Sequence, residues 1–160
     1  MVANLPTNTV SSILRDIKVH NNHAFIVSEA SRHGMQVVDL TQLSAIANPP
    51  QDIEADALYM GWGNAHNIVI NESTARAYGV GTATFAGGLH ILDISDPVNP
   101  TLIGDYAGDG YTHDAQQPIG LLALRRWQRG KALLWRASVI LTWLCEDVEQ
   151  EVGFLLGVEL

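Results

Sequence analysis

Imidazole and carboxylate groups are the side chains of this sequence best suited to chemistry, because together they can bind a divalent metal ion. The chain contains six histidines. Two of them, His66 and His113, begin matching short motifs; the second motif continues with Asp114, and Asp16 occupies the same position in a third. These four residues are the candidate metal ligands. No compact metal-binding pattern such as H-E-x-x-H strengthens the hypothesis.

The alternative for these residues is structural, and we favour it because the positions repeat. A recurring polar side chain can bond to neighbouring backbone groups and so lock adjacent elements together. Asp39 and Asp93 close two equivalent segments, where a carboxylate can accept hydrogen bonds from the amides of a tight turn. The calcium-loop pattern D-x-[DN]-x-[DN]-G is absent, so both aspartates are interpreted as structural.

Other catalytic patterns are missing. The glycine-containing stretch 79–84 lacks the third glycine of G-x-G-x-x-G and the lysine of a P-loop. There is no G-x-S-x-G, the pattern of a nucleophile elbow. A single cysteine, Cys145, excludes an intrachain disulfide framework and a cysteine-rich zinc site. Whether the chain is an enzyme stays open at this point, with a non-enzymatic function favoured.

The elements that must position the candidate ligands recur along the chain with a period of roughly 50 residues. Segments 16–20, 24–27 and 34–40 match segments 67–71, 77–80 and 88–94 in order. A further match links 61–67 to 108–114. The repeating unit therefore occurs twice, and a third copy begins at His113.

Each unit predicts four antiparallel strands. Apolar residues alternate with polar ones in the first two segments, as in a half-buried strand. Asparagines at 21–22 and 71 stand where a tight turn joins these strands, and asparagine tolerates positive φ there. The third strand follows Gly34 or Gly88 and ends at an aspartate.

The second unit also shows where its third strand must end. Pro97 and Pro100 cannot donate to a strand ladder, so the chain leaves the sheet there, before a fourth strand at 101–106. In the first unit, the acidic segment 51–56 is expected to form the connection between the two units.

Four antiparallel strands in such a unit are typical of a β-propeller blade. The predicted fold is all-β: a partial β-propeller with about two four-stranded antiparallel blades and the start of a third. Because the innermost strand of each blade lines a central channel, we expect His66, His113, Asp114 and Asp16 to converge at the starts of these strands.

Parts of this sequence resemble two known families. Residues 88–100, Gly-Leu-His-Ile-Leu-Asp-Ile-Ser-Asp-Pro-Val-Asn-Pro, resemble the LVIVD repeat, a propeller-type repeat of bacterial surface proteins. Segments 15–19, 24–35, 63–70 and 109–116 resemble the choice-of-anchor B family of secreted or surface-attached proteins. The resemblance covers about residues 10–116. It implies a β-propeller outside the cell or on its surface, with no established activity and no agreed catalytic residues.

The chain divides at about residue 116 into blades (1–116) and an atypical segment (117–160). The first part contains all nine asparagines and all four tyrosines, whereas the second contains ten leucines and three of the four tryptophans. Helical spacing of apolar residues from Leu134 to Leu155 predicts an amphipathic helix. This helix could cover an open blade edge. Alternatively, a frameshift after Gln116 produced a non-native tail, which we favour because the family resemblance ends within a strand.

Composition excludes several function classes. The formal net charge of -8 argues against nucleic-acid binding, which needs a basic surface. No signal peptide is visible at the start, and no apolar run is long enough to span a membrane.

The function we expect is that of a non-enzymatic repeat module, secreted or on the cell surface, that binds a protein or glycan. The alternative is a metal-dependent propeller enzyme, a hydrolase or lyase, that uses the channel histidines and aspartates with a divalent metal as cofactor. An incomplete propeller leaves blade edges open, so we also expect self-association.

Overall fold

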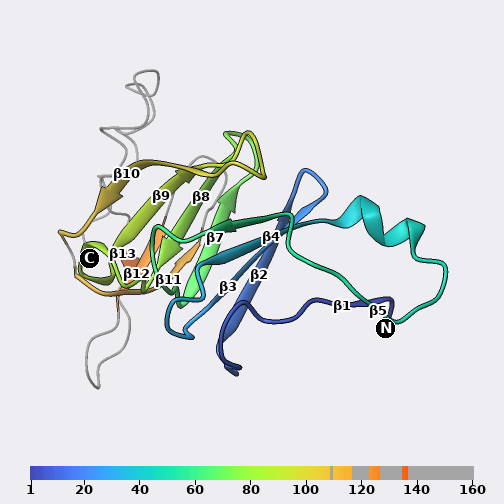
Figure 1. Ribbon diagram of the computed structural model, residues 1–160. Coiled ribbons are helices and arrows are strands. Elements are labelled where there is room, and N and C mark those ends of the chain that lie inside the picture. Colours follow the sequence, from blue (N-terminus) through green and yellow to red (C-terminus); the bar gives the residue numbers. More distant parts are fainter. Residues whose placement is uncertain (109, 117–122, 127–134, 137–160) are drawn as a thin grey trace.

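The computed structural model shows a predominantly β protein (Figure 1). The structure describes residues 1–108, 110–116, 123–126 and 135–136. Within them lie two four-stranded antiparallel sheets, a three-stranded antiparallel sheet and a two-stranded parallel ribbon. The predicted all-β architecture with about two four-stranded blades is confirmed.

The first blade consists of β2 (Arg15–His20), β3 (His23–Ser28), β4 (Met35–Asp39) and β6 (Ala57–Tyr59), paired in that order. Its first hairpin turns at Asn21 and Asn22, whose φ angles are 47° and 59°. Both lie in the left-handed region, as predicted for these asparagines.

The second blade repeats this order with β7 (Asn67–Asn71), β8 (Arg76–Val80), β9 (Leu89–Asp93) and β10 (Thr101–Tyr106). Pro97 and Pro100 lie between β9 and β10, as predicted.

The turn after β7 differs from the expectation. Asn71 Oδ1 accepts hydrogen bonds from the backbone amides of Ser73 and Thr74, at 3.0 and 3.3 Å. The positive φ is found at Ala75 (50°) instead of at the asparagine. The asparagine therefore shapes this turn through its side chain, because its oxygen replaces a backbone acceptor.

The glycines before β4 and β9 have a common steric cause. A Cβ on Gly34 would lie 2.4 Å from the carbonyl oxygen of Tyr59, and one on Gly88 would lie 2.1 Å from that of Tyr106. Tyr59 and Tyr106 are the last residues of the fourth strands. Both blades therefore need glycine where the chain enters the third strand against the end of the fourth.

The connection between β4 and β6 extends away from the blades (Figure 1). It contains the 3₁₀ helix η1 (Leu40–Ala45) and β5 (Gln51–Asp52), which pairs with β1 (Ala3–Asn4). The expectation that segment 51–56 connects the two units was wrong, because the fourth strand of the first blade follows it. Its Asp56 carboxylate accepts from the backbone amide of Asp39 at 2.7 Å, so this segment helps to hold the blade.

The sheets lie in sequence order with their innermost strands side by side: β2 contacts β7, and β7 contacts β11 (Thr112–Gln116). One core fills the space between the first two blades and a second lies between β7–β10 and β11. The first core comprises Phe25, Val27, Met35, Val37, Trp62, Ala65, Ile68, Ala77, Leu92 and Ile94. The second comprises Val69, Tyr78, Val80, Leu89, Ile91 and Ala115.

The predicted third copy does begin as a strand. β11 pairs antiparallel with β12 (Ala123–Arg126), and β12 pairs with β13 (Trp135–Arg136). Of these two strands, only β13 lies within the helix predicted from Leu134 to Leu155, and there the structure differs from the prediction. Pairing satisfies the open backbone edge of β11, and this outweighs a helical spacing of apolar side chains.

Most of the helix predicted from Leu134 to Leu155 lies outside the described residues. In the part of the chain that the structure describes, no helix is long and apolar enough to cross a membrane.

Candidate functional site at the starts of the innermost strands

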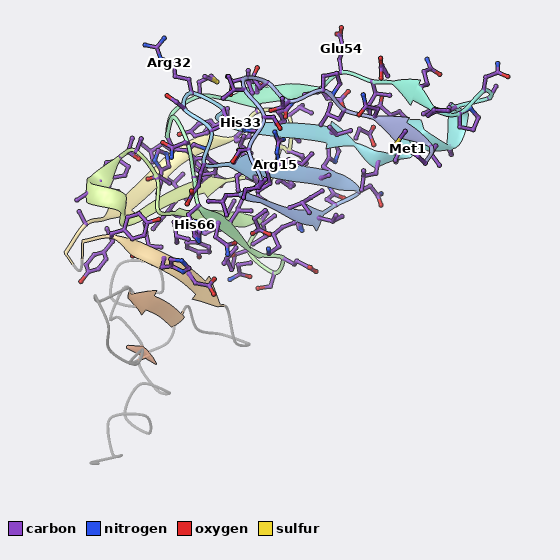
Figure 2. All side chains as sticks on the ribbon, turned by 90° about the horizontal axis from the view of Figure 1, so that it is seen from below. Met1, Arg15, Arg32, His33, Glu54 and His66 are labelled. Carbon is purple, nitrogen blue, oxygen red and sulfur yellow. The ribbon has the colours of Figure 1, made fainter. Side chains whose placement is uncertain are left out.

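The candidate ligands predicted from sequence lie where the innermost strands of the three sheets begin. His66 directly precedes β7, His113 and Asp114 lie in β11, and Asp16 lies in β2. Figure 2 shows Arg15, the first residue of β2, and His66 in the region where the first two blades meet. The structure therefore brings strands from all three repeat units to one place.

The two histidines of the prediction are in contact. The ring centroids of His66 and His113 lie 4.2 Å apart, at an angle of 49°. His66 Nδ1 also hydrogen-bonds the carboxylate of Glu29, which follows β3 of the first blade. The side chains of His66 and Glu29 are 18% and 30% exposed, so this pair is partly accessible to solvent.

Glu29 is a site residue that the sequence analysis missed. The repeat aligns Ala24 with Ala77, which places Glu29 opposite Thr82 in the second unit. Because the position does not keep a carboxylate in both units, the repeat gave no signal for it.

The two aspartates of the prediction join neighbouring sheets. Asp16 Oδ2 accepts from the backbone amide of Ile68 in β7 at 3.1 Å, and its carboxylate also pairs with Lys18 at 2.6 Å. Asp114 Oδ1 lies 3.2 Å from the donating Nδ2 of Asn67. The contacts run from β2 to β7 and from β7 to β11, which is what the structural interpretation of these positions expects.

A metal centre needs several ligands around one point. Among the residues that the structure describes, no three His, Cys, Asp or Glu side chains are grouped so as to hold a metal ion. The metal-binding role of His66, His113, Asp114 and Asp16 therefore stays a prediction.

Tyr111 completes the surroundings of the histidine pair. A Cβ on Gly81 would lie 2.6 Å from the Cβ of His66 and 2.7 Å from the hydroxyl of Tyr111, so all three residues meet closely. Burial raises the pKa of Tyr111, and the nearby negative charge of Glu29 raises it further. The phenol therefore stays protonated at neutral pH and can donate a hydrogen bond beside the His66–Glu29 pair.

The repeated aspartates Asp39 and Asp93 form turns. Asp39 accepts from the backbone amide of Thr41 at 2.8 Å, and Asp93 accepts from the amide of Ser95 at 2.8 Å. Hydrogen bonds from the Thr41 and Ser95 residues hold the pKa values of the two carboxyls below their usual range. The geometry agrees with the structural role inferred from sequence.

His90 of β9 forms a second cluster, with Tyr59 and Thr84, which was not expected from the sequence. It is 1% exposed, and its Nε2 lies 2.7 Å from the Tyr59 hydroxyl, while its Nδ1 lies 2.9 Å from Thr84 Oγ1. Burial lowers the pKa of His90 to about 4. A neutral imidazole donates through one nitrogen and accepts through the other, so the two hydroxyls satisfy both. This cluster ties the first blade to the second.

The side chains at the strand starts are partly exposed to solvent and could take part in chemistry, whereas His90 is buried. A carboxylate that bonds one imidazole nitrogen fixes the orientation of the ring. His66 is held in this way, with a second imidazole against it and a phenol nearby. The site is therefore a partly exposed group of one acidic, two imidazole and one phenol side chain.

The comparisons with known proteins concern the second blade. Residues 82–108 match the family model of the LVIVD repeat, a stretch that includes Gly88, Pro97 and Pro100. No curated protein matches the chain. The resemblance to the LVIVD repeat is confirmed for this stretch, whereas the narrower resemblance to the choice-of-anchor B family stays a prediction.

Proposed function

We propose that this propeller-type repeat module is non-enzymatic and binds a protein or glycan outside the cell or on its surface. One observation carries the proposal: the polar side chains that recur in the repeat are engaged in building the scaffold. Asp39 and Asp93 bond turn amides, while Asp16 and Asp114 bond the neighbouring innermost strand. Such a scaffold supports binding through the loops that it positions.

The loops around Tyr111 provide a suitable binding surface. Tyr111 is 44% exposed and lies beside Glu29, whose carboxylate can accept hydrogen bonds. An aromatic face next to a hydrogen-bond acceptor matches the apolar ring face and the hydroxyl groups of a sugar. We therefore place the binding surface at Tyr111, Glu29 and His66, with a glycan as the favoured ligand.

A glycan array probed with the labelled 160-residue chain tests this placement. We expect binding to a restricted set of glycans, and a loss of about tenfold or more in affinity for Tyr111→Ala, as for an aromatic anchor. Ile103→Ala is the matched control, because Ile103 is 40% exposed on β10 and outside this surface. Equal retention of the wild type, Tyr111→Ala and Ile103→Ala would contradict the placement.

The location outside the cell is tested separately. An epitope-tagged chain, expressed in its native cells, should be cleaved by protease added to intact cells. Protection until the cells are lysed would contradict a surface location.

The His66–Glu29 pair supports a second candidate function, that of a metal-dependent propeller hydrolase or lyase. In that function His66 and His113 would supply imidazole ligands and Asp114 or Asp16 a carboxylate. Titration with Zn²⁺, followed by calorimetry, separates the two functions. Stoichiometric binding that His66→Ala/His113→Ala abolishes, and His20→Gln/His23→Gln preserves, would favour the enzyme. The non-enzymatic proposal expects no stoichiometric zinc.

A further inference from the structure

The loop between β8 and β9, residues 81–88, has a strained backbone. Phe85 and Ala86 follow one another with φ angles of 49° and 54°, in the left-handed region that residues other than glycine rarely adopt. Residues in this region cost free energy and persist only where the surrounding contacts hold them in place. The conformation of this loop therefore depends on the groups that it contacts.

The two ends of the 81–88 loop lie against the Tyr111 ring. The amide of Gly81 donates to the carbonyl oxygen of Gly87 at 3.1 Å, which closes the loop. A Cβ on Gly81 would lie 2.7 Å from the Tyr111 hydroxyl, and one on Gly87 would lie 2.6 Å from Tyr111 Cδ2. Because the phenol ring rests against both backbones, the position of the loop ends sets where Tyr111 lies.

His90 of β9 contacts the middle of the same loop. Its Nδ1 lies 2.9 Å from Thr84 Oγ1, and its ring centroid lies 5.1 Å from that of Phe85. Thr84 Oγ1 in turn lies 3.0 Å from Thr82 Oγ1, whose hydroxyl also reaches the carbonyl oxygen of Thr84 at 3.1 Å. The hydroxyl of Thr84 therefore connects the strained part of the loop to a side chain of the sheet.

The His90 ring is itself fixed from its other side. Its Nε2 lies 2.7 Å from the hydroxyl of Tyr59, in the first blade. The rings of Tyr59 and Trp62 stand edge-on to it, with centroids 5.7 and 5.4 Å away. A close-packed ring that is 1% exposed keeps its place. It can therefore serve as a fixed point for Thr84.

We propose that His90 is a positioning residue for the binding surface: it holds the 81–88 loop through Thr84 and thereby sets the place of the Tyr111 ring. His90 is buried, so it acts through the loop and does not touch the ligand. The consequence for ligand binding rests on the proposed function, whereas the effect of Thr84 on Tyr111 can be measured without a ligand.

Thr84→Val tests the link, because it removes the hydroxyl and keeps the shape of the side chain. In the full-length wild type, we expect a nuclear Overhauser effect (NOE) between the Tyr111 ring protons and the Hα protons of Gly87. Thr84→Val should lose this NOE, since the loop is no longer held to His90. On the same glycan array, it should lose about tenfold in affinity, as expected for Tyr111→Ala.

Two variants serve as controls. Thr84→Ser keeps the hydroxyl and should keep both the NOE and the affinity. Val37→Ala makes a cavity in the core between the blades and lowers the stability without touching the loop, so it should also keep both. Should Thr84→Val fail to fold, as judged by circular dichroism, Thr84→Ala provides the measurement.

The two readouts separate this inference from the proposed function. An unchanged NOE in Thr84→Val, or equal losses in Thr84→Val and Val37→Ala, would overturn the positioning role. Loss of the NOE with unchanged glycan affinity would overturn it as well. A wild-type chain that retains no glycan contradicts the proposed function alone, because the NOE comparison needs no ligand.

Discussion

At the scale of the residue, the two blades carry different polar side chains at one equivalent buried position. Gln36 and His90 occupy equivalent buried positions, 5% and 1% exposed, and both bond a group outside their own sheet. Glutamine stays neutral at every pH, whereas histidine carries a titratable group into the interface between the blades. Because burial holds the pKa of His90 near 4, below the ordinary value of 6.5, the interface requires the neutral ring.

This predicts a specific loss of stability in mild acid. Above pH 6.5, His90 is neutral in both the folded and unfolded states. As the pH falls from 6.5 to 4, the unfolded chain binds a proton that the folded one does not, so the free energy of unfolding decreases by at most about 3 kcal/mol. The measurement is urea unfolding across this range.

His90→Gln, which installs the residue of the equivalent position, should flatten that pH dependence. Ile103→Ala, at a residue of β10 that is 40% exposed, should leave it unchanged. Asp39 and Asp93 do not obscure the effect. Both carboxyls have pKa values lowered from the ordinary 3.8, so the stability that they contribute to the folded protein is lost mainly below about pH 3.8. Identical slopes for the wild type and His90→Gln would show that folding does not lower the pKa of His90.

At the scale of the element, the start of the third strand in each blade lies so close to the end of the fourth that it leaves no room for a Cβ atom. The chain enters β9 at Gly88, where a Cβ would lie 2.1 Å from the carbonyl oxygen of Tyr106. The φ angle of Gly88 is -75°, which any residue can adopt. The requirement for glycine at this position is therefore steric and does not come from backbone conformation.

Gly88→Ala should accordingly destabilise the protein by about 1–3 kcal/mol, as overpacking against backbone does. Gly104→Ala is the control: it lies in β10 of the same sheet, and the nearest atom to its Cβ would be 3.7 Å away, an ordinary contact. We expect it to change the free energy of unfolding by less than about 0.5 kcal/mol. Thermal unfolding of both variants makes the comparison, and equal losses would refute the steric explanation.

At the scale of the whole molecule, neither four-stranded sheet has a core of its own. The first core takes Phe25, Val27, Met35 and Val37 from the first blade and Ile68, Ala77, Leu92 and Ile94 from the second, around the fully buried Trp62. The facing sides of the two sheets cover each other, and the opposite side of the second blade packs with Ala115 of β11. The blades should therefore lose their structure together.

Native-state hydrogen exchange can test this coupling. Val37→Ala, a substitution in the first blade, should lower the opening free energy of amides in β8 and β9 of the second blade by the same amount as in β3, about 2–3 kcal/mol. A loss restricted to β3 and β4 would mean that the blades open independently. Ile103→Ala, on the exposed side of β10, should change neither set.

The sequence by itself determined the local structure and its repetition. Alternation of polar and apolar residues in 15–20, an apolar run in 24–27, paired asparagines at a turn, and prolines at 97 and 100 act over a few residues. The strands and their ends could therefore be predicted. The match between the two units then gave the number of strands in each blade. It also indicated that Asp39 and Asp93 have equivalent roles, and in the structure each accepts a hydrogen bond from a turn amide.

Only the tertiary structure decided which side chains meet between the sheets. Glu29 bonds His66, and Tyr59 bonds His90, across 37 and 31 residues of sequence. Such pairs depend on how one twisted sheet stacks on the next, and no periodicity within a strand encodes that distance. The repeat predicted that His66 and His113 would come together because both occupy equivalent positions on neighbouring innermost strands. Glu29 and His90 lack equivalents of their own type in the other unit, so their roles emerged only when the sheets were packed.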